Sequence, residues 1–242
     1  MMEMLKSLIL RIADSKKEPV GTVIDSDDVC HSKTMDGILK MIPVFNIIYS
    51  FWSENNVQFD TVFESLKQCD SLLTKLQEHE DQEKKYINTC IINFDEELRV
   101  IPLAPLKEML VLYKKYRETA GINLVDNDME YIKEYFYEFV RRNHFFEKNS
   151  RLNSVVFYEN LEVASTALRN NDYHKTGRLY QVDFVETRSI DRYDGQWLSD
   201  IKPTFIFKEC LDAIKNYWSG SMTSNPKAEY LFSGKYLLRE LK

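Results

Sequence analysis

One glutamate near the end of the chain has the setting of a reactive carboxylate. Glu229 opens the apolar run Glu-Tyr-Leu-Phe and follows the segment Tyr217-Trp-Ser-Gly220 and a polar loop. The first position of such a strand more often holds Thr or Val, because β-branched residues pack well in sheets. Glu229 is therefore a candidate catalytic group, and the alternative is a solvated charge at the edge of a sheet.

A second polar group leads into another apolar strand. The segment is Ser150-Arg-Leu-Asn-Ser-Val-Val-Phe-Tyr158, and Ser154 lies at the start of its strand. A hydroxyl in that place can face a cleft. The alternative interpretation is a turn with a strand cap, because serine and asparagine are also common in turns.

The sequence contains none of the standard motifs for phosphate, dinucleotide or metal binding. It has no GxGxxG and no GxxxxGK[ST] sequence, and it has no GxSxG elbow of a hydrolase. Its cysteines share no CxxC spacing, and Cys30-His31 is a lone adjacent pair. We therefore predict no metal site and cysteines that stay reduced.

The elements that must position these residues form a mixed pattern. Apolar periodicity predicts helices over residues 36–52, 59–77, 106–118, 127–146, 159–170 and 207–218, and strands over residues 7–13, 21–24, 154–158, 178–186 and 229–238. Residues 86–94 fit either a helix or a strand. This order of elements predicts an α+β fold.

Composition narrows the class of protein. The chain has 242 residues, 44% of them hydrophobic, and a net charge of −6. An acidic chain is a poor general binder of nucleic acid. The longest apolar stretch, residues 38–52, is interrupted by Lys40, Pro43 and Asn46, and the N-terminus lacks the core of a signal peptide. We therefore expect a cytoplasmic protein without a membrane partner.

Taken in order, several segments resemble the ADP-ribosyltransferase fold, and most closely a family of predicted transferases of bacteria and phages. The similarity covers residues 140–242, with a second match at residues 5–25 that contains Arg11. The segments that carry it are Ser150-Arg151 with Ser154, Asn160 to Ala164, Leu179-Tyr-Gln-Val182, Asp194 to Trp197, and Tyr217 to Gly234.

The resemblance implies an architecture. The chain would be one ADP-ribosyltransferase-like domain over residues 1–242, with a split β-sheet at its core. Residues 150–242 would form the main part of the NAD-binding core. Residues 36–146 would be a large helical insertion.

The resemblance also implies a reaction. NAD would be the substrate, and its bond between nicotinamide and ribose would break through a transition state resembling an oxocarbenium ion. Glu229 would stabilise the developing positive charge and hold the ribose hydroxyls. Ser154 would be the second catalytic residue, supporting Glu229 and the ribose. No metal would be needed.

Further residues would bind NAD by the same resemblance. Arg11 would contact a phosphate or the ribose of adenosine with its fork of donors. An aromatic ring, that of Phe157 or Tyr158, would stack on nicotinamide. The complete expected set is Arg11, Ile12, Ser150, Arg151, Phe157 and Tyr158.

One departure concerns the acceptor of ADP-ribose. Arginine-directed members of the fold carry Glu or Gln two residues before the catalytic glutamate, and this chain has Lys227 there. We therefore expect a macromolecular acceptor other than arginine, in RNA, DNA or protein. A toxin or a phage-defence effector fits such an activity, with an antitoxin or inhibitor protein as a further partner.

Two other functions remain open. The chain could be an NAD glycohydrolase, in which water replaces the acceptor. It could also be a non-catalytic interaction protein with a degenerate transferase fold, which binds a partner through its aromatic helices. Geometry distinguishes catalysis from mere binding, because Glu229, Ser154 and Arg11 should lie within about one NAD length of each other around a single cleft if they handle one NAD molecule, and a distant Arg11 weakens the catalytic interpretation.

Overall fold

The computed structural model describes residues 9–30, 41–81, 89–94, 97–121, 128–170, 177–202 and 204–241. It combines helices with antiparallel strands and is an α+β protein, as the sequence predicts. The chain divides into two compact units. We call them the sheet unit, Met1–Asp36 with Tyr137–Asp200 and Ala213–Lys242, and the helical unit, Gly37–Phe136 with Ile201–Asp212.

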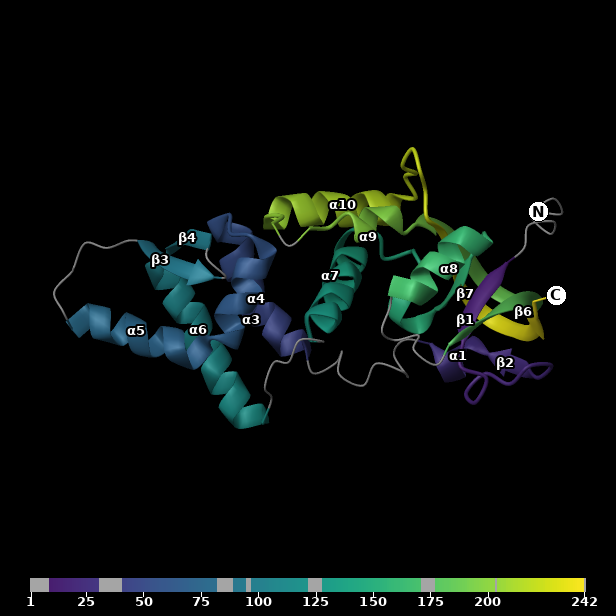
Figure 1. The fold of residues 1–242 in the computed structure, drawn as a ribbon, viewed down its shortest axis with the longest axis horizontal. Helices are drawn as coiled ribbons and strands as arrows, with labels where there is room; N and C mark the ends of the chain where they lie inside the picture. The colour runs from purple at the N-terminus through teal and green to yellow at the C-terminus, as the bar shows by residue number, and fades with distance from the viewer. Residues whose placement is uncertain are drawn as a thin grey trace. The chain divides into compact units, whose positions relative to one another are not determined.

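The sheet unit is built on five antiparallel strands in the order β2-β7-β5-β1-β6. Figure 1 labels β1, β2, β6 and β7 of this sheet. Strand β6 also pairs with β7, so the sheet curls back on itself. The strands are β1 Leu10–Ala13, β2 Val23–Asp25, β5 Val155–Tyr158, β6 Arg178–Asp194 and β7 Ala228–Glu240. The shorter elements are α1 Ser26–Val29, the 3-10 helix Arg151–Asn153, α8 Leu161–Asn170 and α9 Gln196–Ser199.

Two further helices have residues in both units. Helix α7 spans Asp128–His144 and helix α10 spans Phe207–Ser219. In the sheet unit they are joined by a buried hydrogen bond of 2.9 Å from Trp218 Nε1 to the carbonyl of Tyr137. The last turn of α7 is fixed by Glu138, which accepts hydrogen bonds from Arg141, Arg142 and Ser150.

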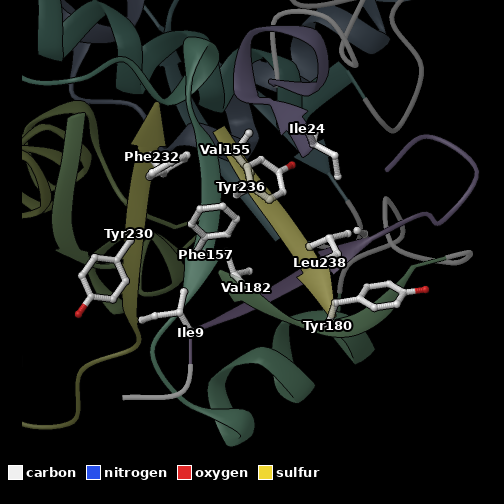
Figure 2. Packing of buried hydrophobic residues seen from close by; sticks show 11 residues of the cluster. Ile9, Ile24, Val155, Phe157, Tyr180, Val182, Tyr230, Phe232, Tyr236 and Leu238 are labelled. Atoms are coloured by element: carbon white, nitrogen blue, oxygen red, sulfur yellow. The ribbon is translucent and has the colours of Figure 1, made fainter. Parts of the chain in front are cut away.

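One face of the curled sheet holds the apolar core of this unit. Strand residues alternate between two faces, so alternate residues of the regular strand segments point into the core. Figure 2 shows the ring of Phe157 in the middle of the cluster, and this ring contacts those of Phe232 and Tyr236. The other members of the cluster are Ile9, Ala13, Ile24, Val155, Tyr180, Val182, Tyr230 and Leu238.

The long strands β6 and β7 bend where their register shifts. The shifts fall between Phe184 and Glu186 and between Thr187 and Ser189, opposite Gly234. Gly234 has a φ of 147°, and a Cβ atom there would lie 2.0 Å from the carbonyl oxygen of Glu186. Only glycine fits this bend, because both the backbone angle and the close strand exclude a side chain.

The helical unit packs aromatic side chains around Trp52. Its indole donates a hydrogen bond of 3.0 Å to the carbonyl of Val57, and its ring contacts Phe59, Phe136 and Phe207. The elements are α3 Met41–Asn55, α4 Phe59–Lys67, α5 Cys69–Asp81, β3 Thr89–Phe94, β4 Glu97–Pro102 and α6 Leu103–Ala120. Strands β3 and β4 form a separate two-stranded sheet.

Several element boundaries differ from the sequence prediction. The helix expected over residues 59–77 is two helices that divide at Gln68. Strand β6 continues to Asp194, eight residues beyond the expected end at Glu186, and β4 was not expected. The residues of the predicted first strand before Ile9 lie outside the described part of the chain. None of the described helices combines the length and the apolar character that crossing a bilayer requires.

Candidate active site

Glu229 lies in the middle of the sheet, at the start of β7. Its neighbours across the strands are Tyr158 on β5 and Tyr193 on β6. Directly opposed residues share a face, so these three side chains are on the face opposite the apolar core. The residue Glu229 is 8% exposed. A buried charge of this kind needs partners, because water no longer solvates it.

Two donors meet at one oxygen of this carboxylate. Tyr217 on α10 donates a hydrogen bond of 2.6 Å to Oε1, and Arg151 donates to the same oxygen in a buried ion pair. Arg151 also donates to the hydroxyl oxygen of Tyr217 at 2.8 Å. Burial raises the pKa of Tyr217 well above its ordinary value, so this hydroxyl keeps its proton and donates.

Aromatic rings hold Tyr217 in place. Its ring stacks on that of Tyr193, with centroids 4.8 Å apart, and Trp218 contacts both rings edge to face. Tyr193 and Tyr217 are both fully buried. The hydroxyl that reaches Glu229 therefore has little freedom, since its ring is packed on two sides.

Asp194 links the turn after β6 to the loop before β7 through hydrogen bonds to its carboxylate. Its carboxylate accepts hydrogen bonds from the amides of Gln196, Thr223 and Lys227 at 2.8–2.9 Å and from the Thr223 hydroxyl at 2.7 Å. Burial works against ionisation, but these donors outweigh it and lower the pKa of Asp194. Asp194 therefore sets the position of the residues on either side of Glu229.

The second carboxylate oxygen of Glu229 lies against Gly195. A Cβ atom added to Gly195 would be 3.1 Å from Oε2. The amide of Gly195 donates to the carbonyl of Lys227 at 2.9 Å, which holds the turn against the strand. Glu229 thus has one oxygen bound by protein donors and one beside a residue without a side chain.

Arg11 does not join Glu229. Leu10 pairs with Tyr158 and therefore shares the face of Glu229, so the next residue, Arg11, points to the other face. There it forms an ion pair of 2.9 Å with the buried Glu18 and donates to the carbonyl of Val156. The expected convergence of Arg11 and Glu229 on one cleft is therefore wrong, although their strands belong to the same sheet.

The partners of Arg11 form a second buried triad. Glu18 accepts hydrogen bonds from Arg11 and from the hydroxyl of Tyr236, at 2.5 Å for the latter. The two faces of the sheet thus each bury an Arg–Glu–Tyr group. Because the guanidinium of Arg11 is occupied by Glu18, the role of Arg11 in binding an NAD phosphate is not supported.

Ser154 directly precedes β5 and caps the 3-10 helix, at the end of the strand away from Glu229, so it gives Glu229 no direct support. Tyr158 is the partner of Glu229, and Ser154 lies four residues earlier, which is roughly 13 Å along a strand. A direct hydrogen bond between the two side chains is therefore excluded. Arg151 and Tyr217 take the supporting role that we expected of Ser154.

The remaining expected NAD-binding residues divide into buried and accessible ones. Phe157 is completely buried in the apolar core (Figure 2), so its ring cannot stack on a ligand. Ile12 is equally buried. Ser150 caps the 3-10 helix and donates to Glu138. Tyr158, half-buried beside Glu229, remains the aromatic candidate. Burial, and then the charge of Glu229, raises its pKa to about 12.

Three residues of this site had no individual role in the sequence prediction. Tyr217, Asp194 and Gly195 all lie in segments that carry the resemblance, yet their types alone indicate no chemistry. Tyr217 could have been found only from the spacing between the end of α10 and β7. In the described ranges, no three histidine, cysteine or acidic side chains are close enough to hold a metal ion.

The fold and the site define an α+β protein with a buried carboxylate clamped on one face of a curled antiparallel sheet. Residues 45–240 match the model of a family described as a protein of unknown function (DUF2441). The match covers most of the chain, and the chain belongs to this family. Among curated proteins no match was found.

Proposed function

We propose that this protein is an NAD-dependent ADP-ribosyltransferase with Glu229 as its catalytic carboxylate. The observation that carries the proposal is the setting of Glu229, a buried carboxylate whose Oε1 is held by Arg151 and Tyr217. Such preorganised charge stabilises a developing cation strongly, because the site does not need to reorganise during the reaction. The α+β fold and the resemblance of residues 140–242 support the same class.

The reaction follows from this chemistry. The bond between ribose C1′ and the nicotinamide nitrogen breaks, and its electron pair leaves with neutral nicotinamide. The sugar then carries positive charge, which the carboxylate of Glu229 stabilises. A lone pair of the acceptor forms the new bond at C1′, and the proton of the acceptor passes to solvent. With Lys227 two residues before Glu229, the acceptor is a group other than arginine in RNA, DNA or protein.

The site also limits which residues take part. Tyr158 flanks Glu229 and would stack on nicotinamide, while Arg151 and Tyr217 would hold the carboxylate. Arg11, Phe157 and Ile12 are occupied or buried and have no part in the proposed contacts with NAD. A cytoplasmic toxin or phage-defence effector, controlled by an inhibitor protein, remains the biological setting that we propose.

The test uses NAD labelled in its adenylate portion, with separate pools of RNA, DNA and protein. We expect wild-type protein to transfer label to one pool and release nicotinamide. Glu229→Gln should reduce both by at least about 100-fold, since it removes the stabilising charge but keeps the shape. The matched control is Glu240→Gln, at the exposed end of the same strand, which should behave as wild type.

Each other outcome has a clear meaning. Nicotinamide release without label on any pool would identify an NAD glycohydrolase. Label transfer that survives Glu229→Ala would remove Glu229 from the mechanism. If NAD is not turned over with any of the three pools, the proposal is overturned and the non-catalytic interaction protein is favoured.

A further inference from the structure

The two oxygens of the Glu229 carboxylate have different surroundings. Oε1 accepts from Tyr217 and from Arg151, on the side of α10. Oε2 is the oxygen that faces Gly195, and Gly195 is half-buried. A carboxylate oxygen has about two acceptor sites, so the protein donors fill Oε1. A ligand that hydrogen-bonds to Glu229 must therefore approach Oε2.

The glycine at position 195 is not required by its backbone. Its φ of −64° and ψ of −10° lie in the region that every residue adopts. What distinguishes the position is space: a Cβ atom would lie 3.1 Å from Oε2 and 3.4 Å from the carboxyl carbon. Any side chain would therefore fill the space beside Oε2.

The turn cannot withdraw to make room for a side chain. Asp194 binds it to Thr223 and to the amide of Lys227, and Gly195 itself donates to the carbonyl of Lys227. These bonds join the turn to the strand that carries Glu229. The spacing between Gly195 and Oε2 is thus fixed by hydrogen bonds on both sides.

We infer that Gly195 determines specificity: its missing side chain leaves the space in which a hydroxyl of the ligand donates to Oε2 of Glu229. The inference rests on the proposed function, under which the ligand is NAD and the hydroxyl belongs to the ribose that bears nicotinamide. Gly195 makes no chemical contribution of its own.

The test compares Gly195→Ala and Gly195→Ser with wild type in affinity for NAD and in thermal midpoint. Ala should weaken NAD binding by about tenfold or more, the effect of losing one hydrogen bond to a charge. Ser should weaken binding at least as much, because its hydroxyl donates to Oε2 in place of the ligand. For the same reason Ser should be at least as stable as Ala. Gln196→Ala, in the same turn, is the control and should bind as wild type.

A ligand variant supplies the second arm. NAD that lacks the 2′ hydroxyl of the nicotinamide ribose should bind wild type less well, and Gly195→Ala should add little to that loss. A purely structural role for Gly195 would instead weaken both ligands equally and lower affinity and thermal midpoint together, and that result would overturn the inference. The wild-type comparison of the two ligands does not depend on whether the variants fold.

The two proposals fail in different ways. If wild type turns over NAD with Glu229 but Gly195→Ala binds NAD normally, only the role of Gly195 is wrong. If wild type binds no NAD at all, the proposed function is overturned and the inference with it.

Discussion

Two stacked tyrosines near Glu229, Tyr217 and Tyr193, differ in whether their hydroxyl groups form a hydrogen bond. Tyr217 donates to Glu229 at 2.6 Å, whereas the hydroxyl of Tyr193 is buried without a hydrogen-bond partner in the part of the chain that the structure describes. Their rings stack and are buried alike. Replacing each tyrosine by phenylalanine therefore compares the loss of a hydroxyl that forms a hydrogen bond with the loss of one that does not.

We predict that Tyr217→Phe lowers the free energy of unfolding by about 1–3 kcal/mol, because a buried carboxylate loses a donor. Tyr193→Phe should cost less than Tyr217→Phe, because the Tyr193 hydroxyl makes no hydrogen bond of normal geometry in the described residues and only lies near the charge of Asp191. Urea unfolding at pH 7 measures both. Equal losses for the two variants would show that the bond from Tyr217 to Glu229 contributes little.

At the scale of single residues, the sequence identified the carboxylate of Glu229, but it did not predict which residues surround that carboxylate. Glu229 stands out because a carboxylate at the start of an apolar strand is unusual. The partners of Glu229 could not be predicted, because they depend on strand register. A shift of one residue exchanges the faces of a sheet, and that is why Arg11 was expected beside Glu229 but lies on the other face.

Among the elements, the bend of β6 and β7 depends on one glycine. Gly234 has a positive φ that other residues rarely adopt, and the carbonyl oxygen of Glu186 lies where a Cβ atom would be. Gly220 also has a positive φ, of 78°, but has open space around it. Comparing substitutions at Gly220 and Gly234 therefore distinguishes the free energy lost to backbone strain from that lost to a steric clash.

We predict that Gly234→Ala lowers the free energy of unfolding by about 3 kcal/mol or more, since strain and overpacking add. Gly220→Ala should cost only about 1–2 kcal/mol, the price of the backbone angle alone. Chemical unfolding of both variants provides the comparison. A Gly234→Ala protein as stable as Gly220→Ala would mean that the bend relaxes easily.

The same bend explains why β6 was predicted too short. Alternation holds through Val182 and Phe184 and is then broken by the register shifts on either side of Glu186 and Thr187. Beyond them, Ile190 returns to the core opposite Phe232. A strand pattern with period two cannot be followed across such shifts, so the sequence prediction ended at Glu186. Helices were easier, because α6 ends at Gly121 in the left-handed conformation that its glycine indicates.

At the scale of the whole molecule, buried carboxylates make stability depend on pH. Burial alone would raise the pKa values of Glu138 and Asp194, but their hydrogen-bond donors outweigh it and both pKa values are lowered. A carboxyl group with a lower pKa in the folded state stabilises the fold above its unfolded pKa. That contribution is lost as the pH falls through the folded pKa.

We therefore predict that the free energy of unfolding falls as the pH drops below about 4, near the unfolded pKa of these groups. Asp194→Asn should be about 2 kcal/mol less stable than wild type at pH 7, because it leaves amide donors facing an amide. The difference should shrink as the pH falls below about 4, because the carboxyl group of unfolded wild type then takes up a proton, and it should vanish once the pH falls through the lowered pKa of folded Asp194. Urea unfolding from pH 7 to pH 3 tests this, and a difference that stays constant with pH would contradict it.

The α+β class could be predicted from the sequence, because it depends on local periodicity in each segment. The grouping of segments could be predicted only in part, because the expected insertion contains residues 37–136 of the helical unit but not residues 201–212. We expected residues 36–146 to form an insertion, and the contacts of the described chain group residues 37–136 with residues 201–212. Helix α10 shows the reason, since Phe207 contacts Trp52 while Tyr217 binds Glu229. The apolar pattern of α10 is continuous, so it does not indicate that the helix begins in one unit and ends in the other.

The central place of β7 has a consequence for the order in which the protein is made. Strand β7 pairs with β2, β5 and β6, although it is synthesised after all of them. Proteins emerge from the ribosome with the N-terminal part first. Until residues 228–240 have emerged, β2 lacks its partner strand and the apolar faces of β5 and β6 lack the residues that cover them. The sheet unit should therefore close only after residues 228–240 have left the ribosome, however early its other strands are made.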